Sequence, residues 1–281
     1  MNKLLITHAE CSDGFTAAWV AHRALQGCAD LHPGYYGTEP PDCSGRDVII
    51  ADFSYKRPAM EKIAAECASL VVLEHHVTAR DELAGDWPSN VQIIFDLNRS
   101  GARLAWDYFY PDEPPPWLIA YVEDRDLWRW ALPDSRLVSA GIESYPRTLE
   151  SWDILAASAV VDVIAEGRII QRYREICIDA AKRLAREFIV AGHWVPVANC
   201  SEMRFASDIA HELSDGRPFA ATWWVRADGI IQFSLRSRED GADVSEIAGV
   251  YGGGGHRHAA GFQVDGASFA EMLKLSKEIG A

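Results

Sequence analysis

Four apolar runs in this sequence end in side chains that can bind metal ions. The residues that follow these runs are His8, Asp52, Glu74-His75-His76 and Asp96. Imidazole and carboxylate groups together suit Mn²⁺, Fe²⁺ or Mg²⁺ better than a cation that prefers thiolates. Two such ions held about 3.5–4 Å apart can activate a water and stabilise an in-line phosphoryl transfer. The pattern therefore predicts a phosphoryl-transfer site in which Asp52 bridges the ions.

Each of these side chains also has an ordinary structural explanation. Adjacent residues of an extended chain, such as His75 and His76, point to opposite faces, so one of them could simply pack in the core. A single Asp at the end of a strand often only caps the helix that follows. Four chemically similar run ends are harder to explain as four unrelated caps, and we therefore favour a common site.

A glycine-rich stretch, Y-G-G-G-G-H-R-H-A-A-G-F at residues 251–262, is the second chemical signal. Consecutive glycines expose backbone N–H groups and permit positive φ, so such a loop can cradle phosphate oxygens. Arg236 could add charge-assisted hydrogen bonds to the same anion. The alternative is a hinge or a tight turn. We favour a substrate-binding loop, and its residues would be Gly253, Gly254, Gly255 and His256.

Strand and helix patterns alternate along the first half of the chain. The expected strands are 3–7, 47–52, 70–73 and 91–95, and the expected helices are 15–25, 58–67 and 100–110. Such alternation predicts an α/β fold with a parallel sheet and right-handed crossovers. Ligands bind beyond the carboxyl ends of strands in such sheets, so the four run ends should converge at one edge.

The second half of the chain shows a different pattern. Residues 149–190 are mostly helical in periodicity, and strand patterns follow at 194–198, 219–225 and 230–236. Asp228-Gly229 between the last two is a strong hairpin signal. We therefore predict three parts: a catalytic domain at 1–148, a helical linker at 149–190, and a smaller α+β domain at 191–281.

Composition narrows the range of partners. The net charge of −14 argues against binding of long duplex DNA, which requires a basic surface, but not against a small anionic substrate in a local pocket. No run approaches 18 apolar residues, and the apolar stretch at the N-terminus is too short for a signal peptide. The expectation is a cytoplasmic protein with reduced cysteines and no membrane contact.

The motifs resemble, in order, those of the DHH phosphoesterase superfamily with its C-terminal DHHA1 domain. The stretches that carry the resemblance are H-A-E-C-S-D-G-F-T-A-A-W, I-I-A-D-F-S-Y, L-E-H-H-V-T-A, F-D-L-N-R-S-G-A-R-L-A-W, E-D-R-D-L-W and G-G-G-G-H-R-H-A-A-G-F. They are most similar to the exopolyphosphatase-related branch. The resemblance implies a hydrolase with one or two Mn²⁺ ions, Mg²⁺ or Co²⁺ being alternatives. Its substrate would be a short oligonucleotide, a cyclic nucleotide or polyphosphate.

The resemblance also implies roles for individual residues. The metal ligands would be His8, Asp13, Asp52, Glu74, His75 and Asp124, with Asp126 as the rival of Asp124. His76 would lie near the scissile phosphate and act with Asp52 in catalysis. Arg99 and Ser100 would lie near the substrate, together with Arg236 and the glycine-rich loop.

Two departures from the family pattern leave a rival hypothesis open. Glu74 stands where the family has Asp, and Cys11 stands near the first of two Asp residues, so Glu10 could replace a lost ligand. The chain could therefore be a catalytically weakened homologue that binds a phosphorylated ligand as a sensor. We favour an active hydrolase because most of the expected ligands are retained. The helices of residues 150–190 could pair in a homodimer.

Overall fold

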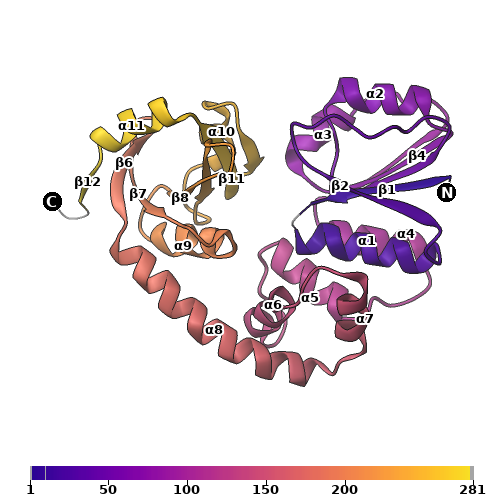
Figure 1. Ribbon diagram of the computed structural model, residues 1–281, viewed down its shortest axis with the longest axis horizontal. Coiled ribbons are helices and arrows are strands. Elements are labelled where there is room, and N and C mark those ends of the chain that lie inside the picture. Colours follow the sequence, from indigo (N-terminus) through magenta and orange to yellow (C-terminus); the bar gives the residue numbers. More distant parts are fainter. Residues whose placement is uncertain (1, 10, 279–281) are drawn as a thin grey trace. The chain divides into compact units, whose positions relative to one another are not determined.

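Two compact units make up the protein in a computed structural model that describes residues 2–9 and 11–278 (Figure 1). The first unit spans residues 1–171 and the second spans 172–281. The division falls inside the segment that we predicted to be a linker. Among the described residues there is no helix with the length and apolar character that crossing a bilayer requires.

A parallel five-stranded sheet forms the centre of the first unit, which confirms the predicted fold class. Its strands are β1 (Lys3–His8), β2 (Ala29–Gly34), β3 (Asp47–Ala51), β4 (Ser69–Glu74) and β5 (Val91–Phe95). Their order in the sheet is β2-β1-β3-β4-β5, and every neighbouring pair is parallel. The sequence patterns did not predict β2, because Pro33 and the polar residues around it interrupt any apolar run.

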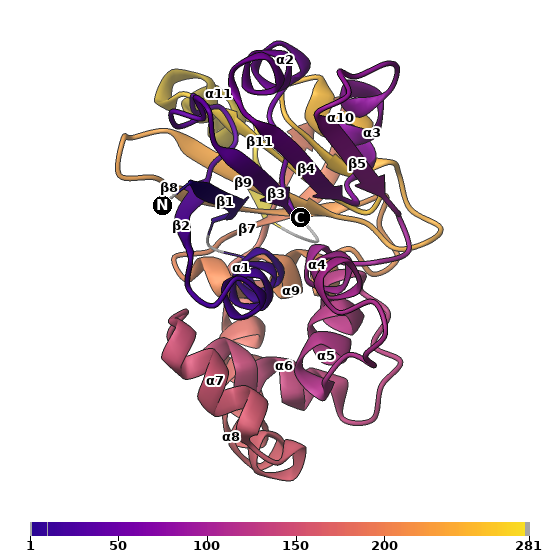
Figure 2. The same cartoon turned by 90° about the vertical axis from the view of Figure 1, so that its right-hand side faces the viewer.

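Helices cover both faces of this sheet, with α1 (Ser12–Ala24) and α4 (Gly101–Phe109) on one face and α2 (Arg57–Glu66) and α3 (Val77–Leu83) on the other (Figure 2). Three further helices belong to the same unit: α5 (Trp117–Asp126), α6 (Ser135–Ser144) and α7 (Leu149–Ala157). Because both faces are covered, β1, β3 and β4 are apolar almost throughout. Leu5 of β1 packs in the cluster on the α1 side, whereas its neighbours Leu4 and Ile6 pack in the cluster on the α2 side.

The strand order places a topological switch between β1 and β3. From β1 the chain passes through α1 to β2, whereas from β3 it passes through α2, on the opposite face, to β4. The two connections separate at the carboxyl ends of β1 and β3, and sheets of this type bind ligands in the crevice that such a switch point provides. The fold therefore identifies the ends of β1 and β3 as the place to look for a site.

A mixed seven-stranded sheet forms the second unit. Its order is β10-β11-β9-β8-β7-β6-β12, and β7 and β8 are its parallel pair. The strands are β6 (Arg186–Val190), β7 (His193–Asn199), β8 (Ala220–Val225), β9 (Ile231–Arg236), β10 (Gly254–His256), β11 (Ala259–Val264) and β12 (Lys277–Glu278). The unit's helices are α9 (Ala206–Leu213), α10 (Val244–Gly249) and α11 (Gly266–Lys274), with a short 3₁₀ turn at Met203–Phe205.

Of the strands in the second half, three lie where they were predicted, one was predicted to be helical, and β10, β11 and β12 were not predicted. β7, β8 and β9 lie where strands were predicted, and β8 and β9 are antiparallel around Gly229, whose φ is +83°. Residues 186–190, predicted to be helical, form β6 instead. Helix α8 (Val160–Arg183) ends before them, and Phe188 and Val190 then alternate into the core.

Candidate active site

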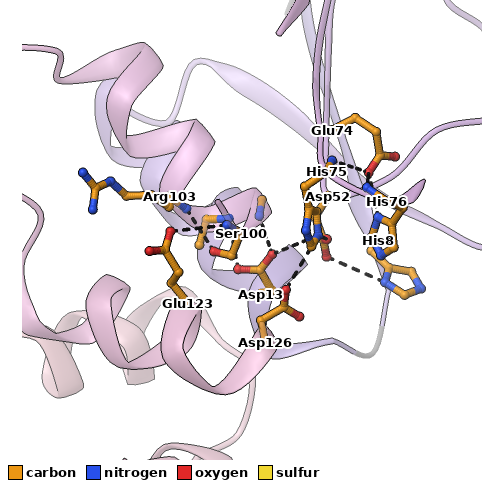
Figure 3. A network of polar contacts seen from close by, with 12 residues as sticks. His8, Asp13, Asp52, Glu74, His75, His76, Ser100, Arg103, Glu123 and Asp126 are labelled. Carbon is orange, nitrogen blue, oxygen red and sulfur yellow. Dashed lines mark hydrogen bonds and ion pairs between the residues drawn. The ribbon is translucent and has the colours of Figure 1, made fainter. Parts of the chain in front are cut away.

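Three strand ends and two helices converge at the crevice of the first unit (Figure 3). Strands β1, β3 and β4 bring His8, Asp52 and the pair His75-His76. Helix α1 contributes Asp13 in its first turn, and α5 contributes Asp126 in its last. The predicted convergence of the run ends is therefore present for three of the four runs.

Asp52 lies at the centre and is held in an unusual conformation. Its φ is +56° and its side chain is buried. A left-handed backbone costs a non-glycine residue about 1–3 kcal/mol and persists only where the surroundings enforce it. His75 Nε2 lies 3.0 Å from Asp52 Oδ1. Asp52 Oδ2 lies 3.7 Å from His8 Nδ1, and no described residue forms a hydrogen bond with it.

Two glycines allow the backbone to approach Asp52 closely. A Cβ on Gly101, at the start of α4, would lie 2.3 Å from the Cβ of Asp52. A Cβ on Gly14, in α1, would lie 2.4 Å from the carbonyl oxygen of His8 and 3.0 Å from Asp52 Oδ2. Any side chain at either position would displace Asp52 or His8. The sequence signal was the glycine that follows Asp13, but its spatial partner could not be deduced from the sequence.

Asp13 joins helix α1 to helix α4. Its carboxylate accepts hydrogen bonds from Gly101 N (2.6 Å) and Ala102 N (3.0 Å), two of the otherwise unpaired N–H groups at the start of α4. Asp13 Oδ2 also lies 3.9 Å from His75 Nε2, and Asp126 Oδ2 lies 3.7 Å from the same nitrogen. Three carboxylates thus surround one buried imidazole.

The ionisation of this cluster reflects its crowded negative charge. Burial, together with the neighbouring carboxylates Asp126 and Asp52, raises the pKa of Asp13, and burial likewise raises the pKa of Asp126. Burial opposes ionisation of Asp52 as well, but the imidazoles of His75 and His8 outweigh it and lower the pKa of Asp52.

The negative charge of these carboxylates stabilises the protonated form of the His75 imidazole. Burial disfavours the charged imidazole, yet the hydrogen bond to Asp52 and the charges of Asp126 and Asp13 raise the pKa of His75 to about 10. A divalent cation could take the place of that proton, because it would meet the same three carboxylates. The electrostatics of the cluster therefore fit a bound cation.

The side chains at the crevice form three overlapping groups of potential metal ligands. Within each group the ligand atoms lie within 4.8 Å of one another. The groups are His8–Cys11–Asp52, Asp52–His75–His76 and Asp13–His75–Asp126. Asp52 and His75 each belong to two groups, as expected if they lie between neighbouring cation positions. Cys11 is an unexpected member, since the sequence suggested a ligand lost at that position.

Glu74 occupies a different place from the one predicted. Its Oε1 accepts hydrogen bonds from the backbone N–H groups of His75 (2.7 Å) and His76 (2.9 Å) and lies 2.6 Å from His76 Nδ1. It belongs to none of the ligand groups formed by the described residues. Burial opposes both charges, but their mutual attraction lowers the pKa of Glu74 and raises that of His76. The carboxylate therefore orients His76 through Oε1, and a role of Glu74 as a metal ligand stays a prediction.

Asp124 is also turned away from the crevice. Its carboxylate accepts hydrogen bonds from Ala131 N (2.9 Å), Leu132 N (3.4 Å) and the hydroxyl of Ser135. Residues two apart on a helix point about 200° away from each other, so Asp126 faces His75 when Asp124 does not. The structure thus places the rival residue, Asp126, where Asp124 was predicted.

The fourth run end does not reach the ligand groups. Asp96 Oδ1 accepts a hydrogen bond from Asn98 N (2.8 Å) and so holds the turn into α4. Asp96 thus has an ordinary structural role in the turn, while Ser100 caps the helix itself.

Arg99 and Ser100 have structural partners of their own. Arg99 forms ion pairs with Asp107 and with Asp96, whose Oδ2 lies 3.5 Å from Arg99 Nε. Ser100 is buried, and its hydroxyl caps α4 by accepting a hydrogen bond from Arg103 N (3.3 Å). Neither belongs to the ligand groups described above, and their role near a substrate stays a prediction.

The glycine-rich stretch of the second unit is more regular than a flexible loop. Gly254, Gly255 and His256 form β10, which pairs with β11. A Cβ on Gly253 would lie 2.1 Å from the carbonyl oxygen of Gly261, so packing alone requires glycine there. Arg236 ends β9 and donates a hydrogen bond to Ser207 Oγ (2.5 Å). Phosphate binding by these residues stays a prediction, and Glu10 lies outside the described residues.

Residues 202–280 match the family model described as the DHHA1 domain. Among curated proteins, the uncharacterized protein R106 of Acanthamoeba polyphaga mimivirus is 30% identical over 286 residues, which cover 94% of this chain and 68% of R106. The oligoribonuclease NrnB of Bacillus subtilis is 25% identical over 213 residues, which cover 69% of this chain and 52% of NrnB.

Two solved structures share the fold over nearly the whole chain. The pGpG-specific phosphodiesterase PggH from Vibrio cholerae has a TM-score of 0.55 and 15% identity, with 98% of this chain and 97% of PggH covered. RecJ from Thermus thermophilus in complex with Mn²⁺ also has a TM-score of 0.55, with 16% identity and coverage of 97% of this chain and 51% of RecJ. Identities this low bear on the fold alone.

Proposed function

Because the chain belongs to the DHH phosphoesterase superfamily and carries a DHHA1 domain, we propose that it is a metal-dependent hydrolase of phosphodiester bonds in short oligonucleotides. One observation carries this proposal: three ligand groups, linked to one another by Asp52 and His75, lie at the topological switch of the sheet. The choice of substrate is supported by the oligoribonuclease NrnB and by PggH, which acts on the dinucleotide pGpG.

Five side chains of the crevice would hold the cations. They are His8, Asp13, Asp52, His75 and Asp126. Mn²⁺ suits the carboxylate and imidazole donors of this set, and the RecJ structure contains that ion. Bound divalent cations would supply Lewis acidity and a nucleophile at neutral pH.

His76 would act on the substrate itself. Glu74 Oε1 lies 2.6 Å from its Nδ1, and the other ring nitrogen, Nε2, would donate a hydrogen bond to a phosphate oxygen. The charge that Glu74 stabilises on the imidazole would favour the transition state, in which negative charge accumulates on that oxygen. The extra methylene of Glu74, relative to the family's Asp, therefore does not by itself remove a functional group from the site.

A substrate panel tests the proposal. The full-length protein, stripped of metal, is assayed with Mn²⁺, Mg²⁺ or Co²⁺ on pGpG, a short RNA oligonucleotide, a cyclic dinucleotide and polyphosphate. We expect Mn²⁺-dependent release of mononucleotides from the first two substrates, and loss of that release in Asp52→Asn. Ligand binding with no turnover under any cation would contradict the proposal and favour the sensor hypothesis instead.

A further inference from the structure

The group His8–Cys11–Asp52 differs from the other two ligand groups because it contains a sulfur atom. Its three ligand atoms lie within 4.8 Å of one another. They come from three places in the fold: His8 ends β1, Cys11 is the N-cap of α1, and Asp52 follows β3. The tertiary fold therefore brings the thiol of Cys11 together with the side chains of His8 and Asp52.

A carboxylate oxygen beside this thiol indicates that a ligand belongs there. Asp52 Oδ2 is buried, and among the described residues it has no hydrogen-bond partner. Asp52 Oδ1 is already engaged by His75 Nε2 at 3.0 Å. His8 Nδ1 lies 3.7 Å from Asp52 Oδ2, which is too far for a hydrogen bond. A buried carboxylate oxygen without a hydrogen bond is costly unless a donor or a cation compensates it. A cation between Asp52 Oδ2, His8 and Cys11 would supply that compensation.

We propose that Cys11 binds one divalent cation through its thiolate, together with His8 and Asp52, and that this position therefore prefers a thiophilic ion such as Co²⁺ or Zn²⁺ to Mn²⁺. The inference rests on the proposed function and names the metal chemistry of the same site. On binding, the S–H bond of Cys11 breaks, a metal–sulfur bond forms, and the proton leaves to solvent. Thiolates select softer cations, whereas the group Asp13–His75–Asp126 has only oxygen and nitrogen donors and keeps the preference for a hard ion.

Cobalt absorption spectroscopy tests the thiolate directly. The full-length protein, stripped of metal, is titrated with Co²⁺, and thiolate ligation produces an intense charge-transfer band in the near ultraviolet. We expect this band in the wild type and in Cys28→Ser, since Cys28 is exposed and belongs to none of the ligand groups of the described residues. Cys11→Ser and Cys11→Asp should bind Co²⁺ without the band.

Metal preference provides the second readout. The ratio of the dissociation constants for Mn²⁺ and Co²⁺, measured by isothermal titration calorimetry, should shift toward Mn²⁺ by at least about tenfold in Cys11→Asp, which replaces sulfur by a hard oxygen donor. Circular dichroism verifies that each variant is folded, and the wild-type spectrum decides the question if neither Cys11 variant folds.

The outcomes separate this inference from the proposed function. Co²⁺ binding to the wild type without a charge-transfer band, or a band that persists in Cys11→Ser, would overturn thiolate ligation. If the wild type then still hydrolyses pGpG with Mn²⁺, the proposed function stands. If no divalent cation binds at all, both proposals fail.

Discussion

At the scale of single residues, Asp124 and Asp126 lie on different sides of α5, and the side that faces His75 carries Asp126. The sequence E-D-R-D-L-W contains both residues. The helical periodicity of the sequence does not show which of the two carboxylates faces the metal site. The distinction depends on the turn after α5, whose backbone N–H groups bind Asp124. That turn contains Trp128 and Trp130, both with positive φ, and tertiary packing of this kind cannot be predicted from local sequence.

A pair of variants tests this assignment. Asp126→Asn should weaken Mn²⁺ binding by at least about tenfold, since removal of an outer-sphere partner alone commonly has that effect. Asp124→Asn should leave Mn²⁺ affinity unchanged and instead lower the free energy of unfolding by about 1–2 kcal/mol, through weaker hydrogen bonds to the turn. Calorimetry and urea denaturation measure the two quantities, and the reverse pattern would restore Asp124 as the ligand.

The Glu74–His76 pair gives a second residue-scale prediction. Glu74→Gln keeps the side-chain length but removes the charge that stabilises the His76 imidazolium, so kcat on pGpG should fall about 10²-fold or more, the range of general acid–base effects. Mn²⁺ affinity should stay the same, because Glu74 lies in none of the ligand groups of the described residues. Glu61→Gln, at an exposed carboxylate of α2, serves as the control. A change in Mn²⁺ affinity with kcat unaltered would show that Glu74 is a ligand after all.

At the scale of elements, the site depends on the close approach of α1 and α4 to the end of β3. Asp13 caps α4 from the first turn of α1, and Gly101 allows Asp52 to lie against the start of α4. The strand and helix patterns predicted most of these elements, since continuous apolar runs are typical of buried parallel strands. They missed β2, where Pro33 and polar residues interrupt the apolar run, and in the second unit they missed β6, β10, β11 and β12.

Gly101→Ala tests this packing. The added Cβ would lie 2.3 Å from the Cβ of Asp52, so α4 or Asp52 has to move. We expect a loss of about 1–3 kcal/mol in the free energy of unfolding, as for other overpacked cores, and a weaker affinity for Mn²⁺. Gly266→Ala in α11 is the matched control, because a Cβ there meets no atom within 4 Å. Equal stability of the two variants would refute the packing argument.

At the scale of the whole molecule, an acidic chain with a net charge of −14 concentrates negative charge at one buried edge of a sheet. Divalent cations would offset this charge and stabilise the folded chain in proportion to their binding. The charge balance could be anticipated from the sequence, as could the convergence of His8, Asp52 and His75. The order of strands that creates the switch point could not, because it depends on pairings between distant segments.

The affinity for Mn²⁺ should depend on pH in a defined direction. Burial and neighbouring carboxylates raise the pKa values of Asp13 and Asp126, so these groups hold protons at a higher pH than exposed carboxylates do. Protons then compete with the cation, and the dissociation constant for Mn²⁺ should rise as the pH falls from about 8 to about 5. Calorimetric titrations at several pH values measure the trend, and an affinity independent of pH would contradict it.

The side chains at the ends of β1, β3 and β4 are expected to hold divalent cations. An anomalous difference map from a crystal soaked in Mn²⁺ tests this directly. We expect a strong peak bounded by Asp52, His75, Asp13 and Asp126. A map without a peak there, or with Mn²⁺ bound only elsewhere on the chain, would contradict it.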